Sequence, residues 1–298
     1  MIVGWDGASY QGRPNVANLK EEGHVFVIEK VTGEGSYVNP FWSGVRDDAR
    51  AAGVLFGSYD WTECQNWANE ADARFAASEY LGVVGARQTG ELLAVDFETP
   101  QWLNGPLGRD IEAAMKAYLY TLRDNSGQPV IVYTGQYFLQ ETGADKWDWL
   151  GRDFILWLAA PGPVAMLPDD APWPAAPAPW SDVALHQHQW HATSTAVVGE
   201  FDRNRFRGTI EELRAMGKPA DEQPQMPPAA PSASDPGFPG IVQADRSLAI
   251  NGVVVPNGYA DRTERLLIQV LNQKTGKQYW VEWQRHQWLP WHEGGIPL

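Results

Sequence analysis

Three short acidic segments carry the residues that could do chemistry in this chain. They are Gly4-Trp5-Asp6, Leu93-Ala94-Val95-Asp96-Phe97-Glu98 and Glu200-Phe201-Asp202-Arg203-Asn204. Each carboxylate lies at the downstream end of an apolar run that has the length of a buried strand. In a closed parallel barrel all such ends open onto one face, so we expect the acids to share one pocket. A group of acids in one pocket suits bond cleavage by proton transfer and charge stabilisation.

The sharpest local signal is the pair Asp96 and Glu98. On a strand these two residues face the same side, which places their Cβ atoms about 6 to 7 Å apart. Two close carboxylates repel, and burial raises the pKa of the drier one, so one acid can stay protonated near neutral pH. Cleavage of a glycosidic bond needs this arrangement. The alternative, that both acids face water, is weakened by their place at the end of the buried run 92–95.

The elements that must position these acids alternate between strands and helices. Strand-length apolar runs occupy residues 2–5, 25–28, 54–59, 92–97, 130–133, 154–158, 183–189 and 197–201. Helical patterns occupy residues 16–22, 41–52, 66–81 and 111–123. Seven prolines in residues 161–180 predict a loop in place of a helix between the sixth and seventh strands. We therefore expect residues 1–217 to form an α/β barrel of eight strands that lacks regular helices in its second half.

A second module is predicted at the carboxyl end. Residues 218–240 hold seven prolines among Ala, Ser, Asp and Gln, which is typical of an extended linker. Within residues 241–298, the segments 247–251, 252–255, 266–271 and 278–283 have strand patterns, which predicts a small β-rich domain. Its tryptophans form either a binding surface for a wall polymer or another chain, or the core of a small domain. They are Trp280, Trp283, Trp288 and Trp291.

Charge and composition exclude several classes of partner. The net charge of −14 opposes binding to a phosphate backbone, so we expect no nucleic acid partner. The chain has no apolar run of membrane-spanning length, so we expect no membrane insertion. The start of the sequence lacks a secretory pattern, which predicts synthesis in a cytoplasm without a signal peptide.

Six short blocks in order make the chain resemble the Chalaropsis-type lysozymes, glycoside hydrolase family 25, over residues 1–217. The blocks are residues 4–12, 29–35, 57–60, 96–98, 131–134 and 201–206. The resemblance implies an irregular TIM-like barrel, five β/α units followed by three further strands. It also implies hydrolysis of the β-1,4 bond between N-acetylmuramic acid and N-acetylglucosamine in bacterial peptidoglycan, with no cofactor and no metal.

The resemblance assigns roles to eight residues. Glu98 matches the general acid, Asp96 its carboxylate partner, and Asp6 and Asp202 the remaining acids of the pocket. The positions that line the substrate groove are Tyr59, Tyr133, Trp157 and Gln189. Two departures fall where we expect the substrate side: Asp60 stands where many relatives have His, and His188-Gln189-Trp190 stands where Trp-Gln-Tyr is usual.

Two other functions compete with this interpretation. His186, His188 and His191 have ligand-like spacing and could serve a metal-dependent hydrolase. Strand alternation opposes this, because His186 and His188 point away from the groove if Gln189 faces it. The second alternative is a carbohydrate-binding barrel without catalysis. The biological setting that the combined features favour is a phage endolysin, which acts on the host cell wall and reaches it through a separate holin.

Overall fold

The computed structural model describes residues 1–218 except 34–36, 63, 99–104 and 164, and beyond them only the strands β10 to β16. The chain divides into two compact units, Met1–Gln225 and Met226–Leu298. Apart from Lys218 and Gly240, the predicted linker 218–240 lies outside the described residues.

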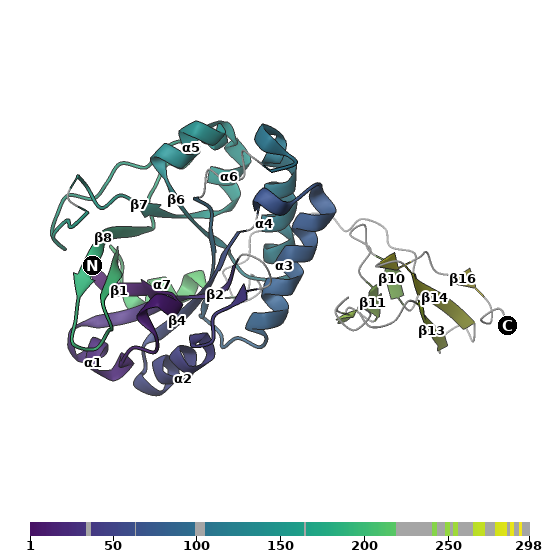
Figure 1. Cartoon of the computed structure of the whole chain (residues 1–298), viewed down its shortest axis with the longest axis horizontal. Coiled ribbons are helices and arrows are strands. Elements are labelled where there is room, and N and C mark those ends of the chain that lie inside the picture. Colours follow the sequence, from purple (N-terminus) through teal and green to yellow (C-terminus); the bar gives the residue numbers. More distant parts are fainter. Residues whose placement is uncertain are drawn as a thin grey trace. The chain divides into compact units, whose positions relative to one another are not determined.

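The first unit contains a closed sheet (Figure 1), which confirms the predicted barrel. Its strands follow the order β1-β9-β8-β7-β6-β5-β4-β2, and β1 pairs with β2 to close the ring. The short strand β3 pairs antiparallel with the end of β2. The strands are β1 (Ile2–Gly7), β2 (His24–Gly33), β3 (Tyr37–Val38), β4 (Leu55–Trp61), β5 (Leu92–Asp96), β6 (Ile131–Gly135), β7 (Ile155–Ala159), β8 (Leu185–Thr193) and β9 (Glu200–Phe206).

The last barrel strand corrects the sequence-based expectation in position and direction. We predicted residues 197–201, whereas β9 starts at Glu200 and runs antiparallel to both β8 and β1. Val197 is buried but belongs to the turn after β8, which ends at Gly199 with a φ of 77°. Because β9 runs backwards, its first residues lie at the edge where the parallel strands end. Asp202 thus lies opposite Asp6 in the β1–β9 register.

Helices lie along much of the outside of the barrel, but beside β8 the ribbon of the described residues shows loops (Figure 1). They are α1 (Val16–Glu21), α2 (Trp42–Ala52), α3 (Glu70–Val84), α4 (Glu112–Ser126), α5 (Gln136–Thr142), α6 (Asp148–Asp153) and α7 (Ile210–Met216), with short 3-10 turns at Ser9–Gln11, Cys64–Asn66, Gly108–Ile111 and Ala144–Lys146. The last three α-helices, of six or seven residues each, were not predicted. In the described residues between β7 and β8 the structure has no helix, as the prolines predict.

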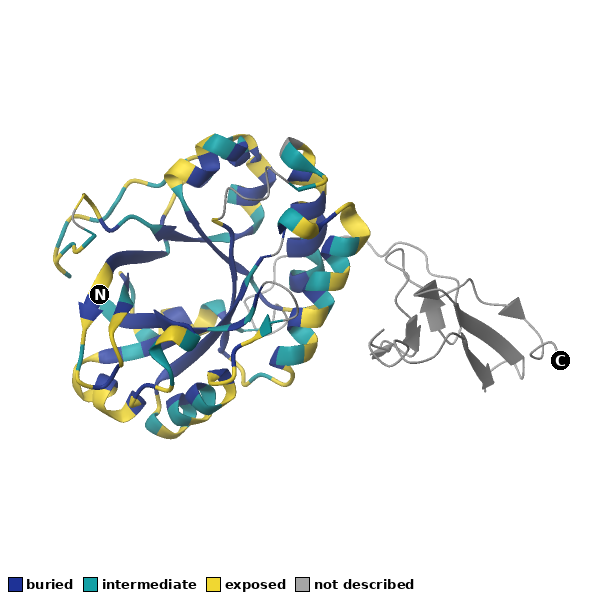
Figure 2. Cartoon of the chain, in the orientation of Figure 1, coloured by how far each residue is buried: buried dark blue, intermediate teal, exposed yellow. Residues whose placement is uncertain are grey.

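Strand alternation separates two apolar layers. On β5, Leu93 and Val95 join the layer between the barrel and the helices, whereas Leu92 and Ala94 join the layer inside the barrel. Leu213 of α7 belongs to the inner layer, so this helix covers the end of the barrel where the parallel strands begin. Figure 2 shows the strands mostly buried and the helices exposed on their outer faces. The opposite end of the barrel interior is therefore the place for a site.

The second unit is described only by its strands. They are β10 (Gly240–Val242), β11 (Leu248–Ile250), β12 (Val253–Val255), β13 (Arg265–Leu271), β14 (Gln278–Gln284), β15 (Gln287–Trp288) and β16 (His292–Glu293). The first three form one antiparallel sheet and the other four form a second. The four predicted segments correspond to β11 to β14. Trp291 lies outside the described residues, so the choice between binding surface and core stays a prediction.

Candidate active site

A cavity of about 80 Å³ opens at the end of the barrel where the parallel strands finish. Its lining contains every site residue predicted from the sequence except Gln189. The lining residues are Asp6, Tyr59, Asp96, Glu98, Tyr133, Trp157, Gln187 and Asp202. Four acids from β1, the end of β5 and β9 thus share one hollow.

Strand register brings these side chains to one level. Asp96 pairs with Tyr133, Tyr133 pairs with Trp157, and Asp6 pairs with Asp202 in neighbouring strands. Each points into the barrel near its open edge, and the inward positions deeper in the barrel hold apolar residues such as Ala94. The top layer of the barrel core is therefore polar, and alternation alone aims it at the cavity.

Gln187 takes the place that we predicted for Gln189. The Gln189 amide donates instead to the Leu167 carbonyl oxygen at 2.7 Å, away from the cavity lining. Both glutamines occupy inward positions by alternation, but the β8–β9 register shifts after Gln187, which turns the later residues toward the proline-rich loop. The cavity lining therefore contains Gln187 and not Gln189.

Asp60 was expected on the substrate side and lies on the outer side of the barrel. Its carboxylate accepts hydrogen bonds from the Tyr118 hydroxyl of α4 and from the Thr32 hydroxyl at 2.5 Å. The residue is buried and absent from the cavity lining. Asp60 therefore ties β4 to its neighbours and does not touch the space where a substrate could bind.

Two side-chain amides point at Asp6. Asp6 Oδ2 accepts from Gln187 Nε2 at 3.0 Å and from Asn204 Nδ2 at 2.6 Å. Indole N–H groups hold the amide oxygens, since Trp190 donates to Gln187 at 2.6 Å and Trp157 donates to Asn204 at 2.7 Å. Sequence reasoning missed the roles of Gln187, Asn204 and Trp190. Alternation from Asp202 was the available signal for Asn204.

The four acids hold protons more tightly than free carboxylic acids. Burial raises the pKa of Asp6 to about 7, against the hydrogen bonds of the two amides. Burial, with the charges of Asp6 and Glu98, raises the pKa of Asp202 to about 8. Burial raises the pKa of Asp96 well above its ordinary value, and the charge of Glu98 adds to this effect. The cavity therefore retains protons near neutral pH, as a general acid requires.

Glu98 differs from the other acids in its access. Its side chain is exposed at the mouth of the cavity, yet the protein around its carboxyl group raises its pKa, while Tyr133 and Lys30 act in the opposite direction. Asp96 lies deeper, and its Oδ1 atom is buried and has no hydrogen-bond partner among the described residues. One acid is thus accessible to a bulky substrate, and the other offers it a buried acceptor.

Three aromatic rings complete the wall of the cavity. The Trp157 ring packs edge to face against Tyr133, with ring centres 4.7 Å apart, and against Tyr59 at 6.3 Å. All three side chains are buried, and burial raises the pKa of both tyrosines well above its ordinary value. The tyrosines therefore remain neutral and form a rigid, partly apolar surface beside the acids.

The histidines considered as metal ligands each have another partner. His186 Nε2 lies 2.8 Å from the Ala160 carbonyl oxygen, and His188 Nε2 lies 2.9 Å from Asp169. His191 contacts Glu200 on the surface. Within the described part of the chain, no group of three His, Cys, Asp or Glu side chains could hold a metal ion. His186 and His188 do point away from the cavity, but into the proline-rich loop and not toward solvent.

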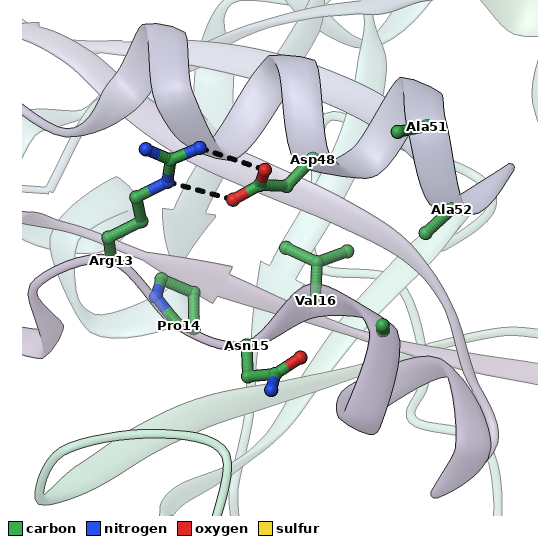
Figure 3. A pocket seen from close by; sticks show the side chains of 8 residues that line it. Arg13, Pro14, Asn15, Val16, Asp48, Ala51 and Ala52 are labelled. Atoms are coloured by element: carbon green, nitrogen blue, oxygen red, sulfur yellow. Dashed lines mark hydrogen bonds and ion pairs between the residues drawn. The ribbon is translucent and has the colours of Figure 1, made fainter.

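A second hollow of about 530 Å³ lies beside α1 and α2, away from the acids (Figure 3). Arg13 and Asp48 form a bidentate ion pair across it, in which Arg13 Nε donates to Asp48 Oδ2 and Arg13 Nη2 donates to Asp48 Oδ1, both at 2.8 Å. Its only acid, Asp48, is paired, and its side chain is 38% exposed. The larger hollow thus lacks chemical groups that could cleave a bond, and the smaller acid-lined cavity is the candidate active site.

A barrel that gathers four proton-retaining acids at one end is the architecture of a carbohydrate-cleaving enzyme. The sequence matches the family model for glycosyl hydrolases family 25 over residues 5–194. The chain belongs to this family and is a glycoside hydrolase. No curated protein sequence matches the chain. Within the described residues, no helix combines the length and the apolar composition that crossing a membrane requires.

Solved structures share this fold at low sequence identity. A bacterial lysozyme from Streptomyces coelicolor has 20% identity and a TM-score of 0.61 over 72% of this chain and 96% of its own. A muramidase from Trichobolus zukalii has 21% identity and a TM-score of 0.59 over 73% and 99%. The catalytic domain of an endolysin from a Listeria monocytogenes bacteriophage has 19% identity and a TM-score of 0.57 over 72% and 98%.

Proposed function

We propose that this glycoside hydrolase cleaves the β-1,4 bond between N-acetylmuramic acid and N-acetylglucosamine in bacterial peptidoglycan. The observation that carries the proposal is the pairing of an accessible acid, Glu98, with a buried acid, Asp96, on the wall of one cavity. Membership of family 25 and the similarity to a lysozyme and a muramidase support the choice of substrate.

Glu98 is the general acid in this proposal. It holds its proton because the surrounding protein disfavours its charge, and it stands at the mouth, where a polymer can reach it. The proton passes from Glu98 to the glycosidic oxygen as the bond from that oxygen to the sugar C1 breaks. Glu98 is left as a carboxylate, which can then take a proton from the attacking water.

Asp96 assists by holding the acetamido group at C2 of the muramic acid ring. Small-molecule sites usually enclose about 300 to 1,000 Å³, so a cavity of about 80 Å³ admits a substituent and leaves the sugar ring above it. The buried Oδ1 of Asp96, without a partner among the described residues, can accept the acetamido N–H. This bond would orient the acetamido oxygen to attack C1, and water would then open the cyclic intermediate.

Asp6, whose pKa of about 7 leaves it partly ionised at neutral pH, supplies negative potential beneath the reacting carbon, and Asp202 lies beside it. Their carboxyl groups face each other across the β1–β9 pair and both receive the Gln187 amide, at 3.0 and 3.3 Å. Positive charge that develops on the sugar ring is stabilised by such fixed groups, which need no rearrangement during the reaction. Tyr59, Tyr133 and Trp157 would give the sugar a stiff apolar surface.

Substitution of Glu98 tests this proposal directly. Glu98→Gln keeps the size of the side chain but cannot donate an acidic proton, so the initial rate on purified peptidoglycan should fall by about 10²- to 10⁴-fold. Binding to insoluble peptidoglycan should stay within about twofold of the parent. Glu70→Gln, in an exposed ion pair with Arg74 on α3, is the matched control. A Glu98→Gln variant as fast as this control would overturn the proposal.

The biological role that we propose is lysis of a bacterial host by a phage endolysin. Similarity to the catalytic domain of a phage endolysin supports it. In this role the enzyme is made in the host cytoplasm and reaches the wall through a separate holin. The second unit, which is built of short β-strands, holds the enzyme on a wall polymer. This raises the local concentration of the enzyme at its substrate.

A further inference from the structure

Trp190 lies in a β-bulge of β8, opposite one acid of the cavity. The register between β8 and β9 sets two residues, Trp190 and His191, against the single residue Asp202. A bulge breaks the regular alternation of a strand and re-aims a side chain, and bulges are frequent beside active sites. The register thus brings Trp190 to the edge of the cavity, on the strand next to Asp202.

The indole of Trp190 is held at the cavity wall by its polar edge. Its Nε1 atom donates to Gln187 Oε1 at 2.6 Å, and Gln187 lines the cavity and donates in turn to Asp6 at 3.0 Å. Because an indole has a single N–H group, this hydrogen bond fixes which edge of the ring faces the cavity. The side chain is nevertheless 44% exposed, so an apolar part of the ring faces solvent at the cavity mouth.

The proline-rich loop fixes the backbone around Trp190. The Trp190 N–H donates to the Ala165 carbonyl oxygen at 2.9 Å, and the Leu167 N–H donates to the His188 carbonyl oxygen at 3.0 Å. Ala165 has a φ of 56°, which is unfavourable for a residue with a Cβ atom and is found mostly at functional sites. Met166, between the two bonded loop residues, is 40% exposed. The loop therefore holds Trp190 in place and adds a second exposed apolar side chain at this edge.

The order of the strands shows how a polymer can cross the mouth of the barrel. β8 and β4 are four strands apart in both directions around the ring of eight. Asp96 and Glu98, at the end of β5, lie on the arc between them that includes β6 and β7, whereas Asp6 and Asp202 lie on the arc of β9, β1 and β2. A polymer laid from β8 to β4 therefore passes between these two pairs of acids. Trp61, which packs against the inner layer, ends β4 at the far side.

We propose that Trp190 is the platform of a second sugar site, which binds an N-acetylglucosamine ring next to the muramic acid ring above the cavity. The inference rests on the proposed function for the identity of the polymer. A cavity of about 80 Å³ holds a substituent only, so the neighbouring sugars lie on its rim. In a strand of alternating sugars both neighbours of a muramic acid are N-acetylglucosamine, so the ring on Trp190 is the same in either direction of the strand.

The chemistry of N-acetylglucosamine suits an exposed indole. The hydroxyl and acetamido groups of this ring point outward around its edge, which leaves C–H groups on its two faces. Such a face packs on an aromatic surface and removes apolar area from water. Muramic acid carries a bulky lactyl group at C3, which N-acetylglucosamine lacks, so the latter can approach the indole more closely. Trp190 thus supplies binding energy and takes no part in the transfer of the proton.

The test is a calorimetric titration of the full chain with a soluble tetrasaccharide of two peptidoglycan repeats. Every chain in the titration also carries Glu98→Gln, so that the ligand stays intact. Trp190→Leu removes the aromatic surface and should weaken binding about tenfold. Trp190→Phe keeps a ring but loses the hydrogen bond to Gln187, and its affinity should stay within about threefold of the parent. Equal affinities of these two variants would overturn the proposal.

Phe75→Ala is the matched control. Phe75 of α3 is 42% exposed, close to the 44% of Trp190, but it lies on a helix and does not line the cavity. Its removal should leave the affinity unchanged, and a loss as large as that of Trp190→Leu would refute a specific site. If Trp190→Leu fails to fold, the indole N–H signals in NMR decide. The signal that is missing in Trp190→Phe should shift in the parent when the tetrasaccharide is added, and a signal that stays in place would refute the site.

Kinetics on peptidoglycan separates the platform from the acids. With Glu98 intact, Trp190→Leu should raise KM about tenfold and leave kcat within about threefold, because the platform binds ground state and transition state alike. A fall in kcat at unchanged KM would overturn the platform and indicate support of Asp6 through Gln187. If the parent cleaves no peptidoglycan, the proposed function falls and the titration still decides the sugar site. If the parent cleaves it but Trp190→Leu binds the tetrasaccharide as the parent does, only the sugar site falls.

Discussion

The proline-rich loop that replaces a helix between β7 and β8 is held by one buried cation. Arg205 of β9 is 0% exposed, and its guanidinium group donates to the carbonyl oxygens of Asp169 at 2.6 Å, Ala171 at 2.7 Å and Pro172 at 3.0 Å. It also donates to His186 Nδ1 at 3.0 Å. We predict that Arg205→Leu destabilises the first unit and loosens the loop that packs against β8.

The expected loss of stability in Arg205→Leu follows from the polar groups that lose their hydrogen-bond donor. Three carbonyl oxygens and one imidazole nitrogen lose a charged donor. Each buried acceptor without a partner costs about 1 to 3 kcal/mol, partly recovered when water enters. We therefore expect the free energy of unfolding to fall by about 3 to 5 kcal/mol, as for the loss of one member of a buried polar cluster.

Arg207, the first residue after β9, provides a matched control. Its guanidinium carbon lies 5.3 Å from the centre of the Trp173 ring, against 5.0 Å for Arg205, but its side chain is 49% exposed. Arg207→Leu loses a surface ion pair with Asp182 and the contact with the Trp173 ring, and it should cost no more than about 1 to 2 kcal/mol. Urea unfolding of Met1–Gln225, followed by circular dichroism, measures both. Equal destabilisation by the two variants would refute the anchoring role of Arg205.

Three further predictions concern pH, metals and the second unit. Burial raises the pKa of Glu29 to about 8 from an ordinary 4.5, so the folded chain binds a proton that the unfolded chain has lost. The free energy of unfolding should fall as pH rises from about 4.5 through 8. Glu29→Gln keeps an acceptor for Asn39 and should make this fall shallower, as unfolding midpoints measured across the pH range would show. An unchanged dependence of the midpoint on pH would contradict the raised pKa of Glu29. Chelation with EDTA should leave peptidoglycan hydrolysis unchanged, whereas activity lost on chelation and restored by zinc would overturn the metal-free mechanism. Met1–Gln225 alone should cut purified peptidoglycan as fast as the full chain but clear whole cells more slowly; equal activity on cells would contradict a targeting role for the second unit.

Strand patterns predicted the barrel and the level of its acids because both follow from local rules. An apolar run that ends in an acid places that acid at the barrel edge, and alternation aims Asp96 inward between outward Val95 and Phe97. The direction of β9 could not be predicted in this way. Val197 is apolar and buried like a strand residue, and only the fold shows that it lies in a turn.

The difference between the predicted Gln189 and the Gln187 of the cavity lining has a similar origin. Residues two apart on a strand face the same side, so alternation treats both glutamines alike. The register shifts between β8 and β9 separate them, and these depend on long-range pairing with β9 and on contacts with the loop at Leu167. The network of Trp190, Gln187 and Asn204 was beyond sequence reasoning for the same reason.

Product analysis tests the central claim, that the four-acid cavity cleaves the bond on the muramic acid side. Peptidoglycan of defined composition is digested with the chain, and the new reducing ends are reduced and identified by mass spectrometry. If Glu98 acts as proposed, muramic acid is found at every new reducing end, in amounts that fall with Glu98→Gln. Glucosamine at those ends, or products that persist unchanged in Glu98→Gln, would contradict it.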